Sequence, residues 1–152
     1  AMKEERFTDA TSLSTEALQA LRGHIFEDAW NEAFCRFQLG KQALAKREVQ
    51  EAGEQLRHAL ALAHEWSLLP ATLHLFVGFA GLAKQHGKFE QAATLLAVVA
   101  NHSAGMFETI SEARRRLEAF PKDLVEVGLA RAKDANPNEI ATKLLLGSAT
   151  TA

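Results

Sequence analysis

The stretch AKREVQEAG at residues 45–53 is matched, 40 positions later, by QHGKFEQAA at residues 85–93. Bulky residues fall on bulky ones and small residues on small ones in this alignment: Val49 on Phe89, Ala52 on Ala92, Leu56 on Leu96. A fixed period of this size is typical of stacked helical hairpins, because one helix pair cannot bury its apolar faces alone. The period therefore predicts that the chain folds as a row of packed helix pairs.

The composition favours helices over strands. Alanine and leucine supply 49 of the 152 residues, and both are strong helix formers. Valine, isoleucine and threonine supply only 18 residues and tyrosine is absent, which leaves little material for a β-sheet. We therefore predict an all-α fold of antiparallel helical hairpins, stacked as a short α-solenoid and closed by C-terminal capping helices.

Apolar spacing, prolines and capping residues divide the chain into segments. Residues 1–13 are predicted to be a flexible lead-in, and residues 148–152 a tail. Helical repeats are expected over residues 14–105, with full repeats at about 30–66 and 69–105, and capping helices over 106–147. The individual helices are expected at about 14–23, 27–46, 48–66, 67–86, 88–101, 106–120, 121–133 and 137–147.

The segment at residues 85–93 resembles the turn and second-helix start of a tetratricopeptide repeat. Residues 45–53 resemble the same element with Arg47 in the glycine slot, and Leu39-Gly40 resembles the Leu-Gly pair of the first helix. The resemblance covers about residues 30–105 and implies stacked hairpins whose first helices line a concave surface. The chain departs from the family in its period of 40 residues, where 34 is usual, which implies longer helices.

A longer stretch, residues 56–146, resembles the C-terminal repeat array of large bacterial signalling ATPases and transcriptional regulators. In those proteins a nucleotide-binding or DNA-binding domain carries a tetratricopeptide array. The resemblance implies a role in signal transduction, and that this chain is the C-terminal piece of a longer regulator.

The resemblance also implies a partner-binding groove along the first helix of each repeat. The matching positions are Phe34, Phe37, Lys41 and Leu44 in one repeat, and His74, Val77, Gly81 and Lys84 in the next. Such a mixed groove suits a peptide with apolar anchors and an acidic group. The alternative is a groove filled by the flanking helices of the array itself. Phe76 and Phe79 share a stripe with Ala80 and Ala83, which favours a place in the core.

Other residue patterns argue against catalysis, metals and nucleic acids. The net charge is −2 with both signs interspersed, so a dedicated nucleic-acid surface is not expected. The six histidines and Cys35 show no metal-ligand spacing, and Gly78 and Gly81 form no phosphate loop. We expect Cys35 to be buried, the run Arg114–Arg116 to be a solvated face, and no cofactor or metal to be bound. The single cysteine suggests a reducing compartment, hence the cytoplasm.

The sequence thus predicts a non-enzymatic interaction module that binds a protein, a peptide or other domains of a parent chain. A small-ligand-sensing or autoinhibitory C-terminal domain of a nucleotide-driven regulator is the alternative, and a free-standing enzyme is the least favoured hypothesis. No membrane partner is expected, because the longest apolar run, residues 95–100, is too short to span a bilayer. The apolar face near residues 14–30 is expected to be covered either by residues 1–13 or by a second copy of the chain, and the second case predicts a homodimer.

Overall fold

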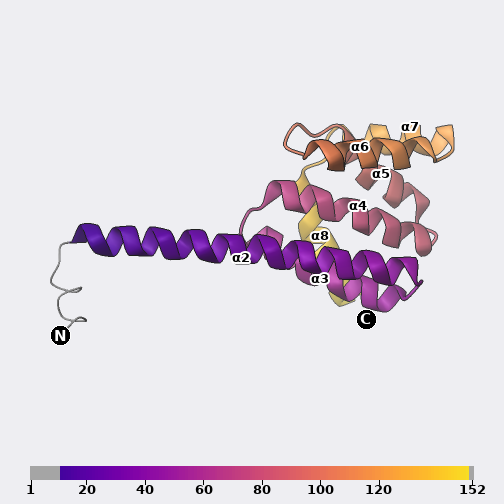
Figure 1. Ribbon diagram of the computed structural model, residues 1–152. Helices are drawn as coiled ribbons and strands as arrows, with labels where there is room; N and C mark the ends of the chain where they lie inside the picture. Colours follow the sequence, from indigo (N-terminus) through magenta and orange to yellow (C-terminus); the bar gives the residue numbers. More distant parts are fainter. Residues whose placement is uncertain (1–10, 151–152) are drawn as a thin grey trace.

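The computed structural model describes residues 11–150, and within that range it contains seven α-helices and no strand (Figure 1). The all-α prediction is therefore confirmed. The helices are α2 (Thr11–Ala45), α3 (Val49–Glu65), α4 (Leu69–Gln85), α5 (Phe89–Ala100), α6 (Phe107–Glu118), α7 (Lys122–Ala132) and α8 (Pro137–Thr150).

Consecutive helices pack as hairpins from α2 to α6, each against the one before it. The first helices of successive pairs also touch, since α4 contacts both α2 and α6. The last two helices do not continue this row. Helix α7 lies mainly along α5, and α8 crosses back over α3 and α4 (Figure 1).

Three tight turns set the spacing of the hairpins. Arg47, Ser67 and Gly87 all adopt the left-handed conformation, with φ of 59°, 53° and 76°. In each turn the next residue's backbone N–H donates to a carbonyl five positions earlier: Glu48 to Ala43 (2.9 Å), Leu68 to Ala63 (2.8 Å), Lys88 to Ala83 (2.8 Å). This is the Schellman arrangement that ends a helix. The turns recur every 20 residues, so two helices give the period of 40, and Arg47 does occupy the slot that Gly87 holds in the next hairpin.

Small residues let the helix backbones approach at the crossings. Leu56 of α3 is fully buried between two glycines, Gly40 of α2 and Gly78 of α4. A Cβ on Gly78 would lie 2.8 Å from Leu56 Cδ2, closer than real contacts allow. Phe76 and Phe79, with 0% and 5% exposure, belong to the same core, as their stripe predicted.

Two helix ends differ from the sequence prediction. The predicted break at Gly23 is wrong, because α2 runs without interruption from Thr11 to Ala45. A lone glycine inside a helix costs about 1 kcal/mol, which is too little to end a helix when no turn residue follows. Likewise α8 continues past Gly147 to Thr150. Most of the predicted lead-in, residues 1–10, lies outside the described residues.

Candidate functional site

The predicted groove positions all lie on one face, formed by α2, α4 and α6. Helix α4 runs between the other two, and His74, Val77, Gly81 and Lys84 follow one another along it at steps of three or four residues. That spacing brings them to a single face of the helix. Two adjoining depressions on this face share Phe37 and Lys41, and together they contain every predicted groove residue. We call this surface the groove.

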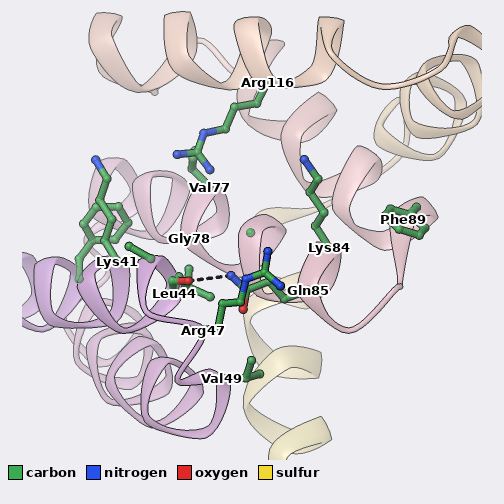
Figure 2. Close-up of a pocket in the computed structure, with 13 residues that line it drawn as sticks. Lys41, Leu44, Arg47, Val49, Val77, Gly78, Lys84, Gln85, Phe89 and Arg116 are labelled. Atoms are coloured by element: carbon green, nitrogen blue, oxygen red, sulfur yellow. Dashed lines mark hydrogen bonds between the residues drawn. The ribbon is translucent and has the colours of Figure 1, made fainter.

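The larger depression, here the basic pocket, has a volume of about 720 Å³ (Figure 2). Its lining residues come from α2 to α6 and from the first turn: Phe37, Lys41, Leu44, Ala45, Arg47, Val49, Val77, Gly78, Gly81, Lys84, Gln85, Phe89 and Arg116. Four of them are cations and none is acidic. Figure 2 shows Lys41, Lys84 and Arg116 entering the pocket from α2, α4 and α6.

The smaller depression, here the aromatic pocket, has a volume of about 520 Å³. It lies between the last third of α2, the first half of α4 and the start of α6, and its lining is Phe34, Phe37, Gln38, Lys41, His74, Met106, Phe107, Glu108, Thr109 and Glu112. Phe107 is 83% exposed, an unusual position for a large apolar side chain. The two pockets give the groove a cationic end and an aromatic end that carries two carboxylates.

The cations of the basic pocket differ in their partners. Arg116 donates from Nη2 to Glu112 Oε1 at 2.8 Å, which orients its side chain across the groove. Lys84 Nζ lies 5.7 Å from the ring centroid of Phe120. Lys41 and Arg47 are exposed, and neither they nor Lys84 form an ion pair with any residue the structure describes.

Two of the four cations were not in the predicted groove. Arg116 was placed on a solvated face with local ion pairs; it does pair with Glu112, yet it also reaches the pocket. Arg116 is far from Lys41 and Lys84 in sequence, so the sequence alone does not indicate that the three side chains line one pocket. For Arg47 the sequence pattern predicts only a place in the turn. The signal that could have revealed it is the arginine itself, standing in a glycine slot.

His74 forms the junction of the three helices that line the groove. Its ring lies 5.1 Å from that of Phe34 and 4.2 Å from that of Phe37, both on α2. On the other side, a hydrogen bond of 2.9 Å joins His74 Nδ1 to the hydroxyl of buried Thr109 on α6. Burial lowers the pKa of His74 below its usual value of 6.5; Lys41 lowers it further, and Glu112 and Glu108 oppose the shift.

This lowered pKa predicts a pH-dependent stability. Because folding holds His74 neutral, the unfolded chain takes up its proton first as the pH falls below about 6.5. The contribution to folding is therefore complete above that pH and declines as the pH falls toward the folded-state pKa. Urea unfolding between about pH 7 and pH 5 is expected to show wild type losing more stability than His74→Gln. Equal losses in the two proteins would contradict the assignment.

The other chemically distinctive residues lie outside the groove. Cys35, expected to be buried, is exposed, because it falls between stripe positions Phe34 and Phe37 on the outer side of α2. Among the described residues, no group of three or more histidine, cysteine, aspartate or glutamate side chains is placed to hold a metal ion. No helix in the described range has the length and apolarity needed to span a membrane.

Comparison of this chain with protein-family models, with curated proteins and with solved structures finds no match. The function therefore has to be argued from the groove itself.

Proposed function

We propose that this protein is a non-enzymatic interaction module that binds a peptide or a protein surface in the groove. The observation that carries the proposal is the lining of the basic pocket. Its floor is apolar, with Phe37, Leu44 and Val77, and its rim carries exposed cations that lack anionic partners among the described residues. A floor of this kind holds apolar side chains, and charged groups at the rim select among partners.

The basic pocket gives little support to catalysis. The described polar groups of the basic pocket are Lys41, Arg47, Lys84, Gln85 and Arg116, which offer cations and an amide but no carboxylate base. Gln85 Nε2 donates to the carbonyl of Leu44 at 2.8 Å and so joins the ends of α2 and α4. The arrangement binds and orients anionic groups, and it lacks the paired nucleophile and base that group transfer needs.

The proposal extends to the wider context of the chain. Three left-handed turns at equal spacing, together with the small residues at the helix crossings, support a tetratricopeptide-like array. We propose that such an array serves a larger bacterial regulatory protein in the cytoplasm. The partner is then a separate protein or another domain of the same parent chain.

Reversing two charges in the groove tests the function. We expect Lys41→Glu/Lys84→Glu to abolish capture of a partner from a lysate of the source organism, because both side chains border the same pocket. Lys122→Glu/Lys143→Glu changes the net charge equally at exposed positions outside the groove, and it should capture the partner as wild type does. Mass spectrometry of the bound material, with circular dichroism to verify folding, provides the measurement. Equal capture by all three folded proteins would refute the groove as the site.

A small ligand is the second candidate for the basic pocket. The volume of about 720 Å³ falls within the range of sites for small molecules, about 300–1,000 Å³. A ligand sensor in a nucleotide-driven regulator would be stabilised by its ligand, since binding to the folded state raises the Tm. Thermal unfolding with a panel of anionic metabolites tests this function. A rise in Tm that Lys41→Glu/Lys84→Glu removes would favour the sensor over the peptide-binding module.

A further inference from the structure

We infer that the partner segment is an acidic peptide, whose carboxylates meet Lys41, Arg47 and Lys84 and whose apolar side chain fills the floor of the basic pocket. This inference rests on the proposed function and adds the chemistry of the partner. Two independent observations carry it: the charge of the pocket and the backbone conformation of Arg47.

The first observation is a local concentration of positive charge on a chain whose net charge is −2. Four cations line the basic pocket and no carboxylate does. Glu112 neutralises Arg116 from the neighbouring pocket, but Lys41, Arg47 and Lys84 have no anionic partner among the described residues. Positive potential that the protein itself does not neutralise attracts and orients acidic partners.

The second observation is that the backbone of Arg47 adopts a conformation that is strained for any residue with a Cβ. Its φ of 59° lies in the left-handed region, which disfavours residues that carry a Cβ. The same turn position holds glycine at residue 87, where φ is 76°. The turn therefore does not require arginine, and glycine would form it with less strain. Ser67 holds the same conformation away from the groove, and Arg47 differs from it in placing a cation at the pocket rim, which points to a function for that side chain.

The shape and charge of the rest of the groove favour a peptide over a nucleic acid. Part of the apolar lining of the basic pocket stays exposed, so a bound segment gains most by placing an apolar side chain on Leu44, Val49 and Phe89. Toward α6 the groove carries Glu108, which forms no ion pair with the described residues and so repels a continuous phosphate backbone. A peptide whose acidic residues are grouped beside its apolar residue matches this distribution.

Peptide selection tests the inference. Random dodecapeptides displayed on phage are selected on the wild-type protein, and the best binder is measured by fluorescence anisotropy. We expect selected peptides to be rich in aspartate and glutamate and to contain a large apolar residue. Replacing every acidic residue of that peptide by its amide should weaken binding more than about tenfold. Binding should also weaken as the salt concentration rises.

Variants at the two equivalent turns separate recognition from folding. Arg47→Gly should raise the Tm by about 3 °C, because it relieves the backbone strain. It should also lower the affinity for the selected peptide about two- to fivefold. Ser67→Gly relieves the matching turn away from the groove residues, so it should raise the Tm similarly and leave affinity unchanged. Arg47→Lys keeps the charge and should retain most of the affinity.

Each contrary outcome has a distinct meaning. Selected peptides without acidic enrichment, or an Arg47→Gly protein that binds as tightly as wild type, would overturn the inference. If such neutral peptides still lose affinity with Leu44→Glu, at a half-buried position of the basic pocket, the groove is the site and the proposed function survives. Peptides that bind every groove variant equally would overturn both the inference and the proposed function.

Discussion

Replacing Leu56 with alanine is expected to lower the free energy of unfolding by about 2–5 kcal/mol. Leu56 is 0% exposed and lies where α2, α3 and α4 meet, between Gly40 and Gly78. Both glycines come close to the leucine only because they lack a Cβ. Removal of the leucine side chain therefore leaves a cavity that three packed backbones cannot close. Urea unfolding followed by circular dichroism measures the loss.

A second substitution makes this prediction specific to the crossing. Gly78→Ala alone should destabilise the protein, because its Cβ would lie 2.8 Å from Leu56 Cδ2 and 3.2 Å from Phe37 Cε1. In the Leu56→Ala background the same methyl group enters the vacated space. The double variant should then be more stable than the sum of the single effects by at least about 0.5 kcal/mol. Additive effects would show that Leu56 does not fill the space above Gly78.

Gly128→Val is expected to lower the free energy of unfolding by about 3 kcal/mol or more. Gly128 lies in α7, and a Cβ at this position would fall 2.8 Å from both the backbone carbon and the carbonyl oxygen of Ala93 in α5. A flexible side chain could move aside, but the backbone of a packed helix cannot. The α5–α7 contact, which holds α7 to the fold, would have to separate. Urea unfolding again provides the measurement.

Gly23→Val is the matched control for this prediction. It makes the same exchange inside a helix, where a Cβ would meet nothing within 4 Å. Glycine and valine both lie low on the helix-propensity scale, so stability should change by less than about 0.5 kcal/mol. If Gly128→Val were equally harmless, α7 would not be packed on α5 as closely as the structure describes.

The sequence predicted the middle of the fold well because each element there ends in a strong local signal. Helices α3, α4 and α5 begin and end within about two residues of their expected bounds; left-handed turns stand at both ends of α3 and α4 and before the start of α5. The predicted helix end at Gly23 was wrong, because a glycine indicates a helix end only when turn residues follow it, and none follow Gly23. The path of α8 back across α3 and α4 could not be predicted, since it depends on contacts between distant segments.

The candidate site was predictable where helical spacing alone determines the face. His74, Val77 and Lys84 recur at the spacing of a single face, and the structure places all three in the groove. Arg116 reaches the basic pocket from α6 only because α6 packs beside α4. Spacing within one helix carries no information about such a neighbour, so the sequence alone does not predict that Arg116 joins the lysines of this face.

The most direct test of the groove as the binding site is a nuclear magnetic resonance titration of isotope-labelled protein with the selected acidic peptide. We expect the largest backbone shift changes at the groove positions, around Lys41 of α2, Val77 and Lys84 of α4, and Arg116 of α6. Shift changes confined to the outer helices α7 and α8, with the groove unaffected, would contradict this expectation.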